Sequence, residues 1–255
     1  YSLSADHDPI ILRCIGLTIS RLAHETANCN RIITEGGITA LCNIAVKYPT
    51  IPGISQPAAL AFQLLSSYPA VRELVVQEGC VAAIASLLQS TDMYTLQQSL
   101  LALCHLLSEP ENHIPIVQQG MIATLAALSS HDNDLLMDLC ALSFLNFSCT
   151  EESRKHVVGA GAVVAIISLS RHKSLVTQRR CAAALCNVTS YEAGMQRMVG
   201  DGIIPALVNL VVSEDVETVR YACAAICRMC STVENGKLIL ESGAIPNIVC
   251  GAKEG

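Results

Sequence analysis

The chain has 255 residues, of which 51% are hydrophobic and only 15% are charged, so it is a folded protein with a large core rather than a disordered chain. The net charge of -6 argues against general affinity for nucleic acid, which requires a basic surface. The 13 cysteines are an odd number scattered through apolar stretches, which predicts reduced thiols and a cytoplasmic location, with nuclear or cytoskeletal association left open. No apolar run reaches the ~18 residues of a membrane span, so direct membrane insertion is not expected.

A glycine-containing turn recurs along the chain at nearly constant spacing. The intervals between successive reference glycines are 43, 41, 41, 41 and 41 residues, and the glycines are Gly36, Gly79, Gly120, Gly161, Gly202 and Gly243. Fifteen residues before each glycine lies a second recurring position, here named the register row: Arg21, Leu64, His105, Asn146, Asn187 and Arg228. A repeat of about 41 residues therefore covers essentially the whole chain.

The predicted elements follow this repeat in chain order. Residues 1–24 hold the last helix of a partial repeat, and a second partial repeat occupies 232–255. Five complete repeats lie between them, over 25–67, 68–108, 109–149, 150–190 and 191–231. The clearest segment predicts a long helix over 172–190 and shorter ones over 191–200 and 203–212. Each repeat is thus predicted to contain three helices, of which the third is the longest.

The second repeat departs from this pattern. Its stretch AVKYPTIPGISQPAALAF (45–62) contains Pro49, Pro52 and Pro57, and the repeat has two extra residues. We expect its third helix to start late, with Pro57 near the first turn, because proline is tolerated there and not in a helix interior. The expected result is a local change in curvature, and a loop used for binding is the alternative.

Three stretches carry a family resemblance. ALCNVTSYEAGMQRMVGDGIIPALVNLV (184–211), FLNFSCTEESRKHVVGAGAVVAIISL (144–169) and ICRMCSTVENGKLILESGAIPNIV (226–249) each resemble an armadillo repeat. The resemblance implies an all-α fold, a right-handed α-solenoid with three helices per repeat, forming one domain over 1–255. Neither end resembles the polar capping repeat that a solenoid needs, so we expect a longer array.

The resemblance also implies a binding groove. In the family, third helices line a concave groove, and the asparagine at the position of Asn187 hydrogen-bonds the backbone of an extended peptide. Asn146 and Asn187 match this asparagine, while Arg21, His105 and Arg228 keep the row polar and Leu64 interrupts it. The alternative for each asparagine is a bond to neighbouring backbone at a helix end.

Arginines surround the register row. Arg179, Arg180 and Arg220 lie seven or eight residues before it, and Arg21 and Arg228 lie in it. A basic groove on an acidic chain predicts an extended partner segment that is acidic or phosphorylated. The alternative is that these arginines pair with carboxylates of adjacent repeats.

Other functional classes are less consistent with the residues. Nuclear-import adaptors of this family carry tryptophan four residues before the asparagine, whereas this chain has Leu17, Leu60, Leu101, Leu142, Ala183 and Ala224 there. The cysteines of CAAICRMC (223–230) fall on a predicted helix and not on a flexible cluster-binding loop. We therefore predict a non-catalytic scaffold without cofactor or metal. A structural component of a cytoskeletal or ciliary assembly, its groove permanently occupied, is the alternative.

Overall fold

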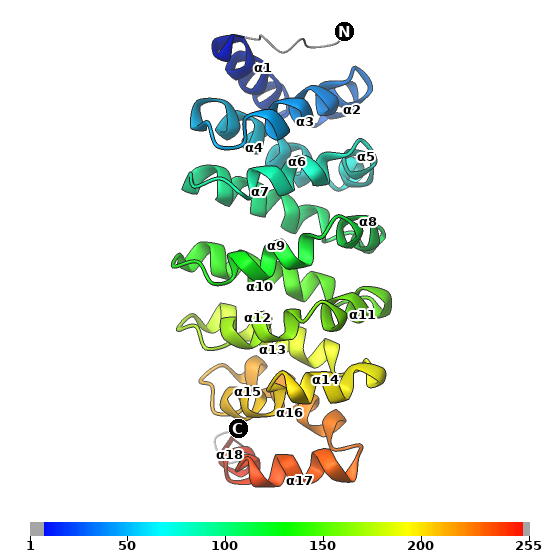
Figure 1. The fold of residues 1–255 in the computed structure, drawn as a ribbon, viewed down its shortest axis with the longest axis vertical. Helices are drawn as coiled ribbons and strands as arrows, with labels where there is room; N and C mark the ends of the chain where they lie inside the picture. Colours follow the sequence, from blue (N-terminus) through cyan, green and yellow to red (C-terminus); the bar gives the residue numbers. More distant parts are fainter. Residues whose placement is uncertain (1–7, 252–255) are drawn as a thin grey trace. The chain divides into compact units, whose positions relative to one another are not determined.

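The computed structural model describes residues 8–251, which contain helices and turns but no strand. The chain divides into two compact units, up to Thr124 and from Leu125 onward, and each is described separately. The boundary falls within helix α9 (Met121–Leu128). Figure 1 shows the elements of both units along the chain.

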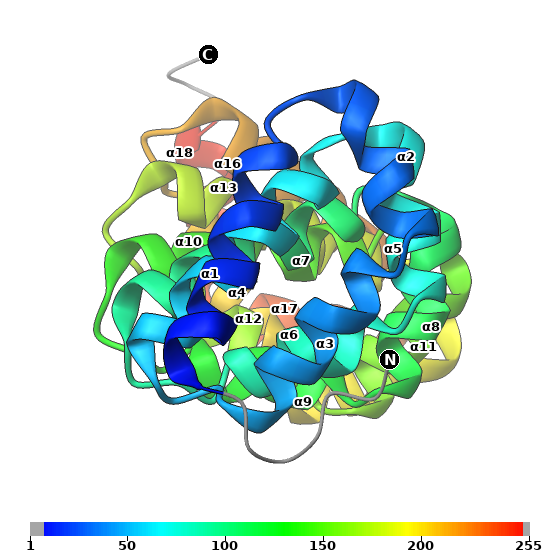
Figure 2. The ribbon, with the colours of Figure 1, turned by 90° about the horizontal axis from the view of Figure 1, so that it is seen from above.

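The first unit contains two complete repeats of helices. Its third helices α1, α4 and α7 pack side by side, with α4 against both others, and its second helices α3 and α6 also pack together. The first helices α2, α5 and α8 share one side of the unit (Figure 2). The elements are α1 (Pro9–Leu22), α2 (Thr26–Thr34), α3 (Gly37–Lys47), α4 (Pro52–Ser67), η1 (Pro69–Val71), α5 (Arg72–Gln77), α6 (Cys80–Leu87), α7 (Met93–Leu106), η2 (Pro110–Asn112) and α8 (His113–Gln118).

The second unit repeats this arrangement. Its third helices are α10, α13 and α16, and α13 packs against both of the others. The elements are α10 (Asp134–Phe147), α11 (Glu151–Gly159), α12 (Ala162–Leu169), α13 (Leu175–Val188), η3 (Glu192–Gly194), α14 (Met195–Gly200), α15 (Ile203–Leu210), α16 (Val216–Met229), α17 (Val233–Glu241) and α18 (Ala244–Gly251). In each unit, apolar faces are buried between neighbouring repeats, as a solenoid requires.

The recurring glycines form the turns between first and second helices, where their spacing predicts them. All six have φ between 73° and 89°, and no other described residue has a positive φ. A left-handed conformation costs a residue with a side chain roughly 1–2 kcal/mol, so glycine is the residue that fits each turn. The regular spacing of these glycines in the sequence therefore reflects a turn with the same left-handed backbone conformation in every repeat.

The third helices begin at a fixed distance from the register row. Each starts twelve residues before it, as Leu175 does before Asn187 and Pro52 does before Leu64. A polar side chain caps most of these starts: Asp92 Oδ2 accepts from the Thr95 backbone N–H at 2.8 Å. The caps fix where each third helix begins, and so where the register row lies on it.

The structure corrects the prediction for the second repeat. Helix α4 begins at Pro52, in step with the other third helices, and Pro57 lies inside it. The two extra residues are absorbed by α3, which has 11 residues where α6 has 8. The error arose because Pro52 at the first helical position already ends the loop, so Pro57 was not needed as a start signal.

The predicted repeat boundaries fall in turns after third helices. Positions 25, 68, 109, 150, 191 and 232 all lie between the end of a third helix and the start of the next first helix. Residues 1–7 and 252–255 of the predicted domain lie outside the described residues. The prediction of a single domain over 1–255 stays a prediction.

Candidate functional site

Asn187 occupies the last turn of α13 and is half-buried. Its Nδ2 donates to the hydroxyl of Ser148 at 2.9 Å, and Ser148 is the buried C-cap residue of α10. The Ser148 hydroxyl in turn donates to the carbonyl of Leu145 at 2.6 Å. Among residues 8–251, no donor reaches the Asn187 side-chain oxygen. The Asn187 amide is therefore anchored through Nδ2 to a side chain of the preceding repeat and not to neighbouring backbone, while its acceptor oxygen is open.

Asn146 holds the equivalent position on α10 and is also half-buried. Because α10 packs against α13, the second unit places the two predicted amides on adjacent third helices. An amide offers donors and an acceptor together, which is the combination a peptide backbone requires.

Arg228 lies one repeat further on, on α16, and is exposed. Its Nη1 donates to the backbone carbonyl of Cys186 at 2.5 Å and lies 3.1 Å from the Cys186 sulfur. The guanidinium thus lies against the C-terminal end of α13, immediately beside Asn187, where a helix favours positive charge. No carboxylate of the described chain pairs with it.

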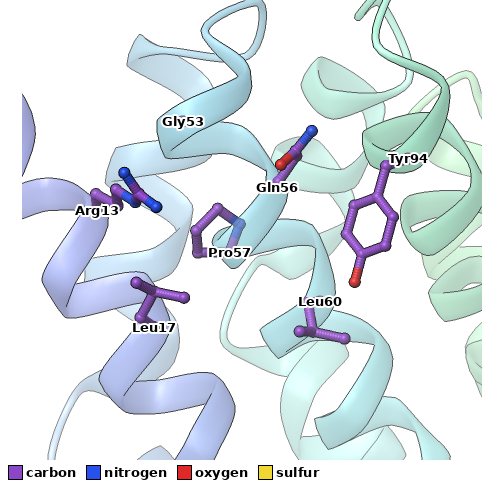
Figure 3. A pocket seen from close by; sticks show the side chains of 7 residues that line it. All are labelled: Arg13, Leu17, Gly53, Gln56, Pro57, Leu60 and Tyr94. Carbon is purple, nitrogen blue, oxygen red and sulfur yellow. The ribbon is translucent and has the colours of Figure 1, made fainter.

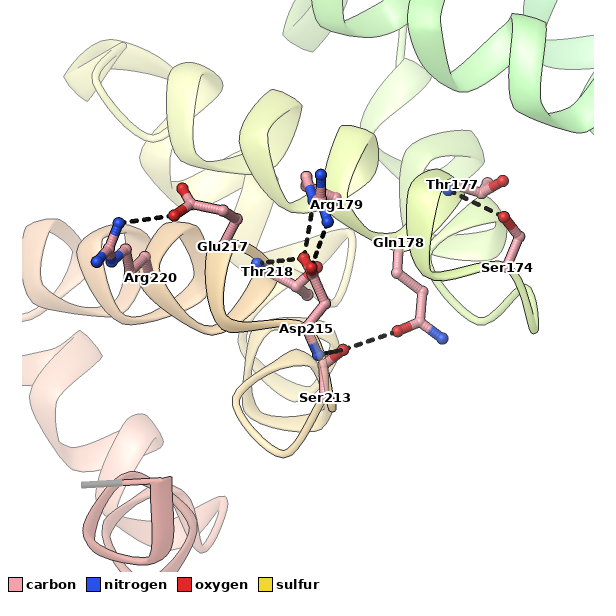
Figure 4. A network of polar contacts seen from close by, with 9 residues as sticks. All are labelled: Ser174, Thr177, Gln178, Arg179, Ser213, Asp215, Glu217, Thr218 and Arg220. Atoms are coloured by element: carbon pink, nitrogen blue, oxygen red, sulfur yellow. Dashed lines mark hydrogen bonds and ion pairs between the residues drawn. The ribbon is translucent and has the colours of Figure 1, made fainter. Parts of the chain in front are cut away.

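Arg179 is paired with a carboxylate of the next repeat (Figure 4). Its Nε donates to Asp215 Oδ2 at 2.9 Å, and its Nη2 contacts Oδ1 of the same carboxylate. Asp215 caps α16 by accepting from the Thr218 N–H at 2.9 Å and the Thr218 hydroxyl at 2.7 Å. The bond from Arg179, together with those from Thr218, holds the pKa of Asp215 well below its usual range despite the opposing effect of burial. Gln56 makes the same link in the first unit, donating to Asp92 at 3.1 Å.

The remaining predicted arginines of the second unit also have partners. Arg180 pairs with Asp138 of α10 at 2.6 Å, and Arg220 pairs with Glu217 of its own helix at 2.6 Å. Arg179 and Arg180 thus bind carboxylates of adjacent repeats, the alternative raised from the sequence. Their charges are matched within the chain, so the surface of these third helices is less basic than its residue types suggest.

The first unit contains the other two predicted residues. Arg21 is exposed in the last turn of α1. His105 on α7 is half-buried, with Nδ1 3.3 Å from the hydroxyl of Ser66. Burial and then the nearby charge of Arg72 lower the pKa of His105 below its ordinary value, so the imidazole is neutral at pH 7. His105 therefore contributes hydrogen-bonding capacity and no charge.

Sequence reasoning missed a second set of arginines. Arg154 donates from Nε to the carbonyl of Ser148 at 2.7 Å and from Nη2 to that of Cys149 at 2.9 Å. Arg72 does the same to Ser66, at 2.8 Å, and to Ser67, at 3.2 Å. These arginines cap the ends of third helices. The available signal was their shared offset of seven residues before a reference glycine.

Several of the described thiols have a pKa raised by burial. Burial raises the pKa of Cys42 to about 11, aided by the charge of Glu78, and burial also raises the pKa of Cys181. Cys223, Cys227 and Cys230 lie on α16 or directly after it, and no cluster of metal-binding side chains occurs in the described part of the chain. The same part contains no helix of the length and apolar character that crossing a membrane requires.

Two segments match a family model described as Armadillo/beta-catenin-like repeat, over residues 69–108 and 196–231. These two segments are armadillo repeats. No curated protein matches it. The all-α armadillo solenoid predicted from the sequence is confirmed, and this fold is typically that of a non-enzymatic scaffold.

Solved structures, among them designed armadillo repeat proteins, resemble the chain in fold. An engineered protein is 24% identical with a TM-score of 0.79, covering 95% of this chain and 60% of its own. A designed armadillo repeat protein in complex with the peptide (KR)4 is 16% identical with a TM-score of 0.73, covering 88% and 99%. A computationally designed armadillo repeat protein for modular peptide recognition is 15% identical with a TM-score of 0.75, covering 86% and 98%.

Proposed function

We propose that this chain is a non-catalytic scaffold that binds an extended, acidic or polar segment of a partner protein along its third helices. The observation that carries the proposal is the amide of Asn187, which is tethered to Ser148 by Nδ2 while its oxygen is open. A tethered amide loses little side-chain entropy when it accepts a bond from a peptide N–H. Armadillo proteins designed to bind peptides share the fold, which supports the same use here.

The charge preference rests on fewer residues than the sequence suggests. Arg228 and Arg21 have no carboxylate partner among the described residues, whereas Arg179 and Arg180 are already paired. We therefore expect a moderate preference for acidic over basic segments. Free thiols throughout the described chain support a cytoplasmic location.

The test is a binding titration with fluorescent peptides of defined charge. An acidic Glu/Ser peptide, a neutral Gly/Ser peptide and (KR)4 are titrated with the chain and with an Asn146→Ala/Asn187→Ala variant. Loss of two hydrogen bonds of about 1 kcal/mol each predicts affinity weaker by roughly ten- to thirtyfold for the acidic peptide. A variant Asn43→Ala/Asn209→Ala changes two exposed asparagines on second helices, α3 and α15, and is expected to bind normally.

Equal affinity of the groove variant and the chain, with helical content unchanged, would contradict the proposed site. Tighter binding of (KR)4 than of the acidic peptide would contradict the proposed partner chemistry. Binding of the control variant must match that of the unmodified chain for either comparison to count.

A further inference from the structure

A pocket of about 200 Å³ lies among the third helices of the first unit, away from the predicted site residues (Figure 3). Its floor is apolar and consists of Leu17 from α1 with Pro57 and Leu60 from α4. Arg13 from α1 and Tyr94 from α7 stand on opposite sides of this floor. Pockets for drug-sized ligands are larger, at about 300–1,000 Å³, so this volume suits a single large side chain.

The pocket results from the unusual composition of α4. Gly53, in the first turn, lines it without a side chain, and a Cβ built there would meet no atom within 4 Å. Leu17 and Leu60 lie four residues before the register row, so the floor follows the repeat. Pro57 adds a rigid ring in the helix interior and has no N–H, which leaves the Gly53 carbonyl without its usual helical donor.

The rim of the pocket carries unmatched polar groups. Arg13 is exposed, and no partner for its guanidinium exists among the residues that the structure describes. Tyr94 is 41% exposed, and its hydroxyl likewise makes no hydrogen bond within residues 8–251. The neighbouring carboxylate of Asp92 is already held by Gln56 and by the hydroxyl of Thr95, at 3.1 and 2.7 Å. Arg13 is therefore an available cation beside an apolar floor.

We propose that this pocket is a specificity site that takes a large apolar side chain of the partner segment, with an adjacent acidic residue bound by Arg13. The proposal rests on the proposed function, because it assumes an extended partner on the third helices. It goes further by naming the sequence that is recognised: an apolar residue next to an acidic one. The Tyr94 hydroxyl and the Gln56 side-chain oxygen are positioned to bond the partner backbone at the rim.

Nuclear magnetic resonance of the ¹⁵N-labelled chain tests this with three synthetic peptides. All have Gly/Ser flanks, and their central pairs are Phe-Glu, Phe-Lys and Ala-Glu. The Phe-Glu peptide is expected to shift the amide signals of Arg13, Leu17, Gly53, Leu60 and Tyr94 in a saturable way. Phe-Lys and Ala-Glu are expected to bind at least about tenfold more weakly, because each lacks one of the two recognised groups.

Variants separate this inference from the proposed function. Arg13→Gln is expected to weaken Phe-Glu binding by about five- to tenfold, and Gly53→Leu is expected to obstruct the pocket. Arg31→Gln removes the same charge on α2, where Arg31 pairs with Glu35, and is expected to change nothing. If Arg13→Gln binds Phe-Glu normally, or Phe-Lys binds equally well, the pocket inference is wrong. Signals that then move around Asn146 and Asn187 would leave the proposed function standing, and no shifts anywhere would overturn both.

Discussion

At the scale of single residues, polar side chains on the third helices are bonded to groups one repeat away. Asn187 reaches Ser148, Arg228 reaches Cys186, and Arg179 reaches Asp215. Each bond lies across the packing surface between two repeats. These side chains therefore stabilise the packing of adjacent repeats in addition to forming part of the third-helix surface.

The helix on which each residue lies could be predicted from the sequence, but the partner that its side chain contacts could not. The glycine period placed Asn187 and Arg179 on third helices, because it reports backbone geometry. It did not show that Asp215 lies beside Arg179, because that depends on rotamers and on the angle between α13 and α16. A partial signal existed: Gln56 and Asp92 have the same separation of 36 residues as Arg179 and Asp215.

Asp215 provides a stability prediction at this scale. Asp215→Ala removes the N-cap of α16 and the partner of Arg179, and is expected to lower the free energy of unfolding by about 1–2 kcal/mol. Asp215→Asn keeps an acceptor for the Thr218 N–H and is expected to cost less. Glu217→Ala, which removes the exposed partner of Arg220 on the same helix, is expected to change stability by less than about 0.5 kcal/mol. Urea denaturation followed by circular dichroism measures all three.

The same variant has a predicted pH dependence. Because the folded state lowers the pKa of Asp215 below the ordinary value of 3.8, its stabilisation is complete above that value. It is lost as pH falls further, through the folded pKa. The difference between the chain and Asp215→Ala is therefore expected to be constant from about pH 5 to 8 and to shrink below about pH 4. A difference that grows on acidification would contradict the assignment.

At the scale of elements, α4 shows how a local irregularity is accommodated by packing. Pro57 lies inside the helix, and α1 approaches it at Gly16, where a Cβ would lie 2.9 Å from the Pro57 Cβ. Interior proline is ordinarily unfavourable by about 3 kcal/mol or more. Close contact with a glycine of the neighbouring helix places the ring in the core, where it is buried. The start of α4 at Pro52 could have been predicted from the register row, whereas the close approach of α1 that accommodates Pro57 could not, because it depends on how the two helices pack.

Gly16 yields the prediction for this scale. Glycine to alanine inside a helix normally stabilises by about 1 kcal/mol, but at Gly16 the new methyl group meets a rigid ring and nearby backbone. Gly16→Ala is therefore expected to lower the melting temperature. Gly236→Ala in α17, where a Cβ would meet nothing within 4 Å, is expected to raise it. Thermal melts that rank the two variants the other way would show that α1 and α4 do not pack as described.

At the scale of the whole molecule, stability is distributed among repeats that contact mainly their neighbours. The sequence predicted this organisation well, because six turns in phase require a repeated backbone. It did not predict the division at Thr124 and Leu125, since the glycine period and the helix pattern continue through that point. The two compact units are defined by which residues contact one another in the folded chain, and the spacing of the glycines carries no information about those contacts.

This organisation predicts that a destabilising substitution lowers the stability of its own repeat and the adjacent repeats, and leaves distant repeats unchanged. Gly161→Ala forces a side chain into a left-handed turn with φ +73° and places its Cβ 3.2 Å from Arg197 Nη2, at a cost of about 1–2 kcal/mol. Hydrogen exchange followed by mass spectrometry is expected to show faster exchange in α11, α12 and their immediate neighbours. Helices α3 and α4 of the first unit are expected to keep their protection. Gly159→Ala, at an open position at the end of α11, is the control.

An equal rise of exchange in both units would contradict this prediction. It would mean that the repeats unfold as a single cooperative block, and the nearest-neighbour description would then be inadequate.

The two extra residues of the second repeat have a consequence for how such chains can change. They extend α3 and leave α4 starting at its usual distance from the register row. Repeat length and the spacing of the third helices are therefore separable quantities in this chain. The C-terminal end of a second helix can accept insertions or a reporter tag without shifting the side chains on the third helix that follows. A chain of this kind can therefore become longer at this site while the spacing of its third helices stays constant.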